Sequence, residues 1–289
     1  MKKTLTTMVL AGLACGSVFA ATDLGTNNTI TGVDSLGIGT QNTISNTSAF
    51  SAGTLNNITA ANAIAFGENN TAGGTNSFVG GNNSKAMGRN SFAYGSHAEA
   101  LVEYTTAIGS QARTAAYDTV AIGNGAYVSG ESSVAIGRTN NITGKNSVVV
   151  GANNNNIKGH QSVVIGYNNK MTDAMEQTII GANSETSGQG AIVVGTHTKA
   201  AAVDAVGIGN NAIADKSNSV AIGTNSVTDD AVAVVDMTVN GKTHAVAGTN
   251  PSAVASFGAK DRAGFGGVTN YTLSLIHISE PTRLGMISY

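Results

Sequence analysis

The sequence is poor in several residue types on which globular enzymes depend. Its 289 residues include 2 Pro, 1 Cys and no Trp, while aromatic residues make up 5% and charged residues 11%. Because large rings provide much of the buried area of a thick core, so few of them argue against an ordinary globular core. The 41% hydrophobic content argues against disorder, which is typical of chains with few apolar residues and high net charge. What remains is a chain of small units, and its 37 Gly direct attention to internal repeats.

The first twenty residues have the features of a secretory signal. Two lysines at the start precede an apolar stretch at 5–14, and Ala20 completes a small-residue cleavage site. The apolar stretch is too short to span a bilayer as a helix. Cleavage after Ala20 would remove Cys15, so the mature chain would have neither disulfides nor a catalytic thiol. A lipoprotein signal ending at Cys15 is the weaker alternative.

The last residues differ from everything before them. Residues 271–289 contain the stretch IHISEPTRLGMISY, which resembles translated sequencing-adapter contamination. We therefore leave this segment out of the fold prediction and expect the native chain to continue past Asn270. Residues 21–270 carry 12 Lys and Arg against 16 Asp and Glu, a net charge of −4. This balance offers no cationic surface for nucleic acid, so we expect no nucleic-acid partner.

Between these ends, one glycine recurs with a period of about fourteen residues. Eleven of the thirteen intervals are 14 residues long and two are 15. We call these the repeat glycines and number positions in each coil from them, negative before and positive after. Fourteen residues fit two short strands and two tight turns, which predicts an all-β solenoid of about fourteen coils. The repeat glycines are Gly39, Gly53, Gly67, Gly81, Gly95, Gly109, Gly123, Gly137, Gly151, Gly166, Gly181, Gly195, Gly209 and Gly223.

The strand before each repeat glycine is apolar on both of its faces. Positions −3 and −1 carry pairs such as Val120 and Ile122, and position −2 between them carries residues such as Ala121. Since alternate side chains of a strand point to opposite faces, both faces need cover. One face would line the core of the coil. Self-association of copies of the chain is the simplest cover for the other.

The segment after each repeat glycine predicts a strand with one exposed face. Positions +3 and +5 are small or apolar, as in Ala98 and Ala100, while position +4 between them is polar or charged. A second set of glycines, Gly130, Gly144, Gly159 and Gly188, marks the next turn, where we expect positive φ angles. The segment from Val232 to Val246 predicts a β-hairpin with Asn240-Gly241 at a type I′ turn.

The best-formed coils share a motif. Asn218 to Ser226 reads NSVAIGTNS, and near copies occur at 133–137 and 146–151. This motif resembles the YadA-like head repeat of the trimeric autotransporter adhesins. The residues that carry the resemblance are Ser133, Val134, Ala135, Ile136, Gly137, Asn146, Ser147, Gly151, Asn218, Ser219, Val220, Ala221, Ile222, Gly223 and Ser226.

The resemblance implies a left-handed parallel β-roll with three chains in each head. It also implies a coiled-coil stalk and an outer-membrane anchor, neither of which lies in this sequence, at the cell surface of a Gram-negative bacterium. Heads of this family bind host matrix proteins (collagen, fibronectin, laminin), host cells or one another. We therefore expect a signal peptide at 1–20, an N-terminal leader at 21–34, head repeats at 35–230, and a hairpin insert and the start of a neck at 231–270.

We expect an adhesin head without catalytic activity, cofactor or metal. Aligning the coils shows no column of clustered Asp, Glu or Arg that a carbohydrate-active solenoid enzyme would need. His97 and His197 lie seven coils apart, which is too far for a shared zinc site, and they read as surface residues. The alternative is a structural or self-associating rod. The candidate ligand surface is formed by position +4, at Lys85, Glu99, Arg113, Tyr127, Lys170, Glu185 and Lys199.

Overall fold

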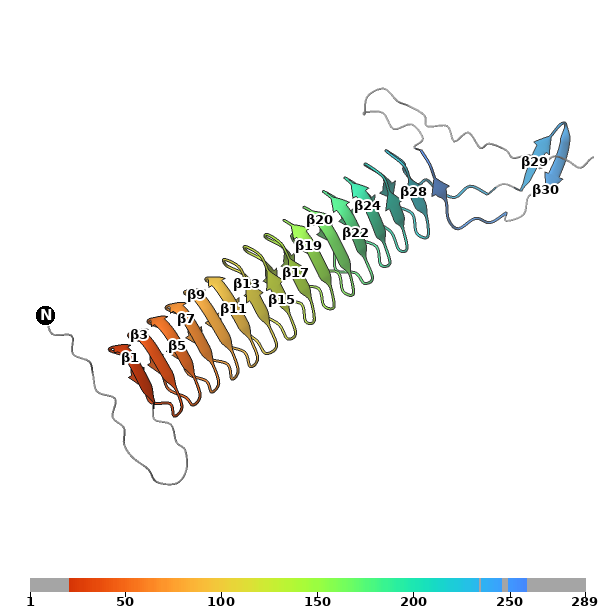
Figure 1. Ribbon diagram of the computed structural model, residues 1–289. Helices are drawn as coiled ribbons and strands as arrows, with labels where there is room; N and C mark the ends of the chain where they lie inside the picture. The colour runs from red at the N-terminus through yellow and green to blue at the C-terminus, as the bar shows by residue number, and fades with distance from the viewer. Residues whose placement is uncertain (1–20, 234, 246–248, 259–289) are drawn as a thin grey trace, which may run out of the picture.

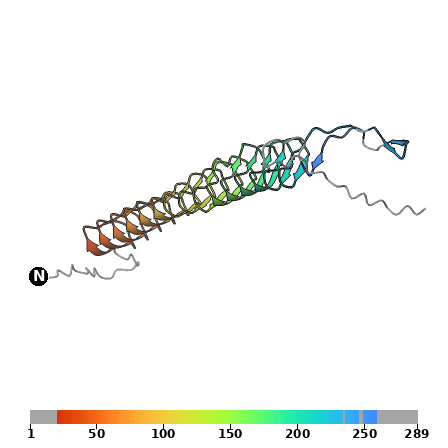
Figure 2. The same ribbon diagram turned by 90° about the horizontal axis from the view of Figure 1, so that it is seen from above.

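The computed structural model describes residues 21–233, 235–245 and 249–258, and these form a long rod with a hairpin at its C-terminal end (Figure 1). The expected signal peptide, residues 259–270 of the segment expected to hold the hairpin insert and the start of a neck, and the adapter-like tail lie outside the described residues. Strands are the regular elements of this part of the chain, and it contains no helix. Seen from above, the coils are stacked one behind another along the length of the rod (Figure 2). The predicted parallel β-solenoid is confirmed, while its trimeric state stays a prediction.

The main sheet has sixteen strands and runs the whole length of the rod. Each strand pairs in parallel with the corresponding strand of the next coil, so that repeat glycine lies beside repeat glycine wherever the pairing extends that far. Its strands are β1 (Thr22–Thr26), β3 (Leu36–Thr40), β5 (Phe50–Thr54), β7 (Ile64–Glu68), β9 (Phe78–Asn82), β11 (Phe92–Ser96), β13 (Thr106–Ile108), β15 (Val120–Ile122), β17 (Val134–Ile136), β19 (Val148–Ala152), β20 (Val163–Tyr167), β22 (Thr178–Ala182), β24 (Ile192–Thr196), β26 (Val206–Ile208), β28 (Val220–Ile222) and β31 (Ala255–Ser256).

The second sheet is formed by two-residue strands at positions +4 and +5 and is split into two parts. Ile157 forms isolated bridges to Ile142 and Met171 across the split, where the two 15-residue intervals fall. The nine-stranded part comprises β2 (Thr29–Ile30), β4 (Thr43–Ile44), β6 (Asn57–Ile58), β8 (Thr71–Ala72), β10 (Lys85–Ala86), β12 (Glu99–Ala100), β14 (Arg113–Thr114), β16 (Tyr127–Val128) and β18 (Asn141–Ile142). The four-stranded part comprises β21 (Lys170–Met171), β23 (Glu185–Thr186), β25 (Lys199–Ala200) and β27 (Ile213–Ala214).

The solenoid is longer at both ends than the periodicity indicated. Strand β1 pairs with β3 in the register of the repeat, with Gly25 beside Gly39, so the segment 21–34 forms a coil rather than a leader. At the other end β31 pairs with β28, with Ala255 beside Val220. The solenoid therefore does not end after Gly223, because a later segment adds one more strand to the main sheet.

The segment between β28 and β31 leaves the rod and returns to it. It contains the predicted hairpin, formed by β29 (Asp236–Val239) and β30 (Lys242–Ala245) in antiparallel pairing. Asn240 and Gly241 have φ angles of 50° and 74°, the left-handed conformation that a type I′ turn requires. The predicted Asn-Gly hairpin is thus confirmed, and it is an insertion within the solenoid rather than an addition after it.

The core of the rod lies between the two sheets, and positions −2 and +5 of each coil contribute residues to it, together with small residues at positions +3 and −4 in several coils. In successive coils Ala121, Ala135 and Val149 are fully buried from the first strand, and Val128 and Ile142 from the second. Positions −3 and −1 point outward, as the alternation predicts. The structure therefore confirms one inward and one outward apolar face on the strands of the main sheet.

The second set of glycines does not have the positive φ angles that we expected. Gly130, Gly144, Gly159 and Gly188 have no φ in the left-handed region, whereas the nearby Ser132 does, at 54°. The reason for these glycines is close packing between coils. A Cβ atom on Gly144 would lie 1.9 Å from the carbonyl oxygen of Gly159 in the next coil.

The repeat glycines combine both constraints, which gives a direct prediction. Gly137 has a φ of 109°, and a Cβ atom there would lie 1.8 Å from the carbonyl oxygen of Gly151. We expect Gly137→Ala to lower the free energy of unfolding by at least about 2 kcal/mol, because the strained backbone and the clash act together. Denaturant unfolding followed by circular dichroism measures the change.

A matched control is available one coil earlier. Gly125 has a φ of 64°, a Cβ atom there would meet nothing nearer than the Thr139 hydroxyl at 3.8 Å, and Asn occupies the same place in several other coils. Because Asn tolerates the left-handed conformation, Gly125→Asn should leave the unfolding midpoint unchanged. Equal effects of the two substitutions would contradict the proposed role of the repeat glycines.

The Asn-Ser pair of the repeat motif connects neighbouring coils. Asn146 takes the left-handed conformation at a φ of 52°. The hydroxyl of Ser147 donates to the carbonyl of Gly159 at 2.8 Å and accepts the backbone N–H of Ser162 at 3.2 Å. A buried hydroxyl thus satisfies two backbone groups of the next coil, which explains why these two residue types precede the apolar run.

A second ladder of buried side chains occupies position +3. The side chain of Asn140 donates to the carbonyl of Gly151 at 2.9 Å, and its oxygen accepts the backbone N–H of Asn154 at 3.1 Å. The sequence analysis described this position only as small or apolar. The structure shows instead that many coils use an amide or hydroxyl here to tie each turn to the next.

Candidate binding surface

The seven candidate ligand residues all lie on the outer side of the second sheet, as their position +4 predicts. Strand pairing places Lys85, Glu99, Arg113 and Tyr127 side by side in four successive coils. Lys170, Glu185 and Lys199 form a second group in three successive coils. We call this line of residues the outer column. The structure thus brings the seven residues into two groups rather than into one continuous surface.

The first group is held together by ion pairs. Glu99 lies between two cations, with its oxygens 3.0 Å from the Lys85 ammonium and 3.2 Å from the Arg113 guanidinium. The Arg113 guanidinium also lies over the ring of Tyr127, 5.5 Å from its centre. We call Lys85, Glu99 and Arg113 the upper triad. Its side chains are partly solvent-exposed, so each pair contributes little to stability and the groups stay available to a ligand.

The second group repeats this order of charges. Lys170 lies 3.6 Å from Glu185, and Lys199 follows Glu185 in the next coil. We call Lys170, Glu185 and Lys199 the lower triad. Each triad therefore has one carboxylate flanked by two cations.

A second line of residues runs beside the outer column at position +2, and we call it the turn row. The backbone there is left-handed in the described coils, with φ angles of 54° at Asn69, 54° at Asn83 and 58° at His97. Asn and His are among the residues that accept this conformation most readily. The Asn69 side-chain nitrogen donates to the Asn83 side-chain oxygen, so these amides form a ladder along the rod.

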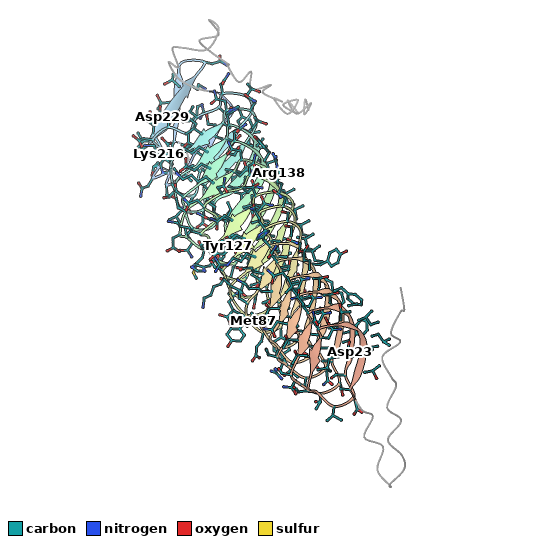
Figure 3. All side chains as sticks on the ribbon, turned by 90° about the vertical axis from the view of Figure 1, so that its left-hand side faces the viewer. Asp23, Met87, Tyr127, Arg138, Lys216 and Asp229 are labelled. Atoms are coloured by element: carbon teal, nitrogen blue, oxygen red, sulfur yellow. The ribbon has the colours of Figure 1, made fainter. Side chains whose placement is uncertain are left out.

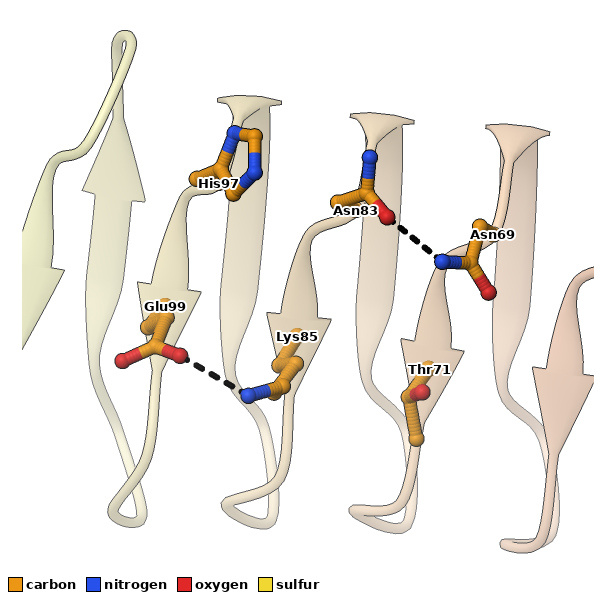
Figure 4. A pocket seen from close by; sticks show the side chains of 6 residues that line it. All are labelled: Asn69, Thr71, Asn83, Lys85, His97 and Glu99. Atoms are coloured by element: carbon orange, nitrogen blue, oxygen red, sulfur yellow. Dashed lines mark hydrogen bonds and ion pairs between the residues drawn. The ribbon is translucent and has the colours of Figure 1, made fainter.

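Between the turn row and the outer column lies a shallow groove (Figure 4). Asn69, Asn83 and His97 line one side, and Thr71, Lys85 and Glu99 line the other. Strands β8, β10 and β12 position the second set, and the turns that precede these strands position the first. The groove offers amide, hydroxyl, imidazole, ammonium and carboxylate groups, which suit a polar ligand held by hydrogen bonds.

The rod also carries an ion pair outside the outer column that the sequence analysis did not identify. Arg89 pairs with Glu103 at 3.0 Å and lies 5.1 Å from the centre of the Tyr104 ring. The hydrogen bond that the Arg89 guanidinium donates to the Glu103 carboxylate raises the pKa of Arg89 above its ordinary value. Comparison of residues fourteen apart outside position +4 would have found this pair.

The view with side chains shows Tyr127 and Met87 on the side of the rod opposite Arg138 (Figure 3).

The described part of the chain shows no grouping of three or more His, Cys, Asp or Glu residues that could hold a metal ion. His160 lies 3.3 Å from Asp173, the one carboxylate that pairs with it among the residues that the structure describes. His97 and His197 occupy left-handed turn positions seven coils apart and are solvent-exposed. Within the same described residues, no helix has the length and apolar character needed to cross a membrane.

A comparison with known protein families finds a match within the coils of the rod. The model of the YadA head domain repeat, in two copies, matches residues 59–84, 103–126, 115–140, 129–154 and 200–226. All five matches fall within the solenoid, and of the seven outer-column residues they include Arg113 and Tyr127. The chain carries YadA head domain repeats. No curated protein matches the chain.

The YadA head repeats have some positions that are similar in every coil and others that vary. The repeat glycine, the buried residue at position −4 (Ser147 and Ser219 in the motif) and the apolar strand belong to the part of each coil that repeats. Position +4 varies from coil to coil, with Thr71, Lys85 and Glu99 in three neighbours. The constant positions build the rod and the variable ones determine what its outer surface presents.

Proposed function

We propose that the rod is the head of a trimeric autotransporter adhesin that binds host matrix or cell-surface ligands multivalently. The observation that carries the proposal is the set of YadA head repeats stacked in register, with one apolar face left uncovered along the main sheet. YadA-like proteins are homotrimeric and adhesive, and they are surface-exposed autotransporters of Gram-negative bacteria. The expected signal at 1–20 and the expected hairpin insert and start of a neck at 231–270 fit export and attachment to a stalk.

The apolar face supports assembly into trimers. Its outward residues include Ile136, Val150, Ile165 and Ile180, which are 41%, 36%, 43% and 44% exposed in the single chain. Toward the N-terminus the same face carries aromatic rings. A continuous apolar strip along a soluble rod marks an interaction surface, and further copies of the same chain can cover it in register because the repeat is identical in each copy.

A trimer would also account for binding through weak individual contacts. The outer column faces away from the core, and each copy would present its two triads at the same levels of the rod. Several weak contacts made at once can exceed the affinity of any one of them by orders of magnitude. The seven candidate residues therefore matter as a repeated surface rather than as one pocket.

The second candidate is a structural or self-associating rod that spaces another module or promotes aggregation of cells. The apolar face favours it as much as it favours a trimer, since both need contacts between copies. Binding of a host ligand separates the two possibilities.

The test uses the chain expressed at the surface of a non-adherent bacterium. Adhesion of these cells to immobilised collagen, fibronectin and laminin and to host cells would be measured beside the clumping of the cells. The adhesin proposal expects attachment above that of the non-adherent strain on at least one of these surfaces. Clumping without attachment to any of them would favour the structural rod.

A further inference from the structure

The turn row contains the same three residues twice. Asn69, Asn83 and His97 occupy position +2 of three successive coils, and so do Asn168, Asn183 and His197. In both sets the side-chain nitrogen of the first Asn donates to the side-chain oxygen of the second, at 2.8 Å in the later set. The repeat of the fold alone does not require His at this position, since Gln, Leu, Thr and Gly occupy it in other coils.

Each Asn-Asn-His row lies beside one of the charged triads. The upper triad begins one coil after Asn69, and the lower triad begins in the same coil as Asn168. The pairing of a row with a triad therefore occurs twice, with a shift of one coil between the two places. We call these the upper and lower sites, and Figure 4 shows the groove of the upper one.

The charges of the two sites favour a ligand with a single negative group. Each triad has two cations and one carboxylate, a net charge of +1, within a segment of net charge −4. Because the segment as a whole is acidic, it repels polyanions at long range. One carboxylate can still replace a water at Lys85 or Lys170, whose ammonium groups have donors to spare beyond their pairs with Glu99 and Glu185.

The remaining lining groups favour a sugar over a protein. The upper groove contains amides, a hydroxyl, an imidazole, an ammonium and a carboxylate, and none of its six lining residues is Phe, Tyr, Trp, Leu, Ile, Val or Met. Protein partners draw most of their affinity from buried aromatic and apolar anchors, which such a groove cannot receive. The His97 Nδ1 atom lies 3.0 Å from the Ser96 hydroxyl, which leaves Nε2 for a ligand hydroxyl.

We propose that the upper and lower sites each bind an oligosaccharide unit that carries one carboxylate, such as a terminal sialic acid. The carboxylate is placed at the Lys of the triad, and the ring hydroxyls at the Asn and His side chains of the row. The two Asn-Asn-His rows lie seven coils apart, about 34 Å along the rod, and Lys85 and Lys170 lie six coils apart, about 29 Å, so a chain presents two separate contacts to a glycan-covered surface. The inference rests on the proposed adhesive function and names a ligand class for it.

The test compares binding of the full chain to a polymer carrying 3′-sialyllactose with binding to the same polymer carrying lactose. The upper site is removed by His97→Asn with Lys85→Thr, and the lower site by His197→Asn with Lys170→Thr. Asn and Thr occupy these positions in other coils, as at Asn69 and Thr71, so the backbone is preserved. Gln41→Asn with Thr43→Asn is the matched control at the same two positions outside both sites.

We expect the unaltered chain and the control to prefer the sialylated polymer. Loss of either site should weaken that binding by about tenfold or more, because avidity between the two contacts is lost. Loss of both should abolish the preference over lactose, with an unchanged melting temperature. Equal binding of the two polymers, unchanged binding after removal of both sites, or stronger competition by a short glutamate peptide than by free 3′-sialyllactose would each overturn the proposal. Attachment to matrix proteins that survives such a result would leave the adhesive function standing.

Discussion

Replacing Asn154 by leucine should destabilise the rod by about 2–6 kcal/mol. The Asn154 side chain donates to the carbonyl of Gly166 at 2.9 Å and accepts the backbone N–H of Asn169 at 3.0 Å. Leucine can form neither bond. The carbonyl of Gly166 and the N–H of Asn169 are then left inside the turn without the partner that Asn154 provides. Each buried group without a partner costs about 1–3 kcal/mol. Unfolding in denaturant, followed by circular dichroism at one fixed protein concentration, measures the loss.

Asn154→Ser is the control that separates hydrogen bonding from packing. Ser84 occupies the same position five coils earlier, where it donates to the carbonyl of Gly95 at 3.0 Å and accepts the N–H of Ala98 at 3.0 Å. A serine at 154 can therefore satisfy the same two groups and should restore most of the stability. A leucine variant as stable as the serine variant would show that the ladder at position +3 contributes little.

The second large effect concerns the assembly of three chains into a trimer. Ile165→Asp places a carboxylate on the apolar face, where each copy of a trimer would bury it without a cation. An uncompensated buried charge costs several kcal/mol per ion, and the cost would be incurred three times. We expect the mass in sedimentation equilibrium to fall from that of three chains to that of one, each of 28.9 kDa.

Tyr127→Asp provides the comparison, because it introduces the same charge on the outer column, next to the Arg113 guanidinium. That variant should keep the mass of three chains. If both variants keep it, the apolar face of the main sheet is not the contact between copies. If the unaltered chain already has the mass of one chain, the trimer proposal fails for this chain.

The periodicity allowed most of the rod to be predicted because one short coil determines the whole structure. Position −2 faces inward at Ala121 and Val149, and position +4 faces outward at Lys85, as the alternation of apolar and polar residues indicates. The periodicity did not predict the insertion between β28 and β31. The segment around Ala255 returns to the main sheet only after the hairpin, so its repeat falls outside the fourteen-residue spacing.

The glycines of the second turn show a further limit. Gly144 is required by the carbonyl of Gly159 in the next coil, a contact between residues fifteen apart that local turn preferences do not contain. The prediction of the candidate ligand surface had the same limit. Position +4 predicted which side chains point outward, but the placement of Glu99 between two cations depends on side-chain reach across coils. Such contacts become visible only when neighbouring coils are compared in register.

The direction of the hydrogen bonds in the main sheet determines how the rod responds to pulling. Bonds such as that from the N–H of Val134 to the carbonyl of Ser147 join one coil to the next, so they lie along the rod. A tensile force along the rod therefore opens one coil at a time instead of shearing many bonds together. Each opened coil releases fourteen residues, about 48 Å of extended chain in place of about 4.8 Å of rod. Under flow, such a rod would lengthen in steps and limit the force that reaches its contacts.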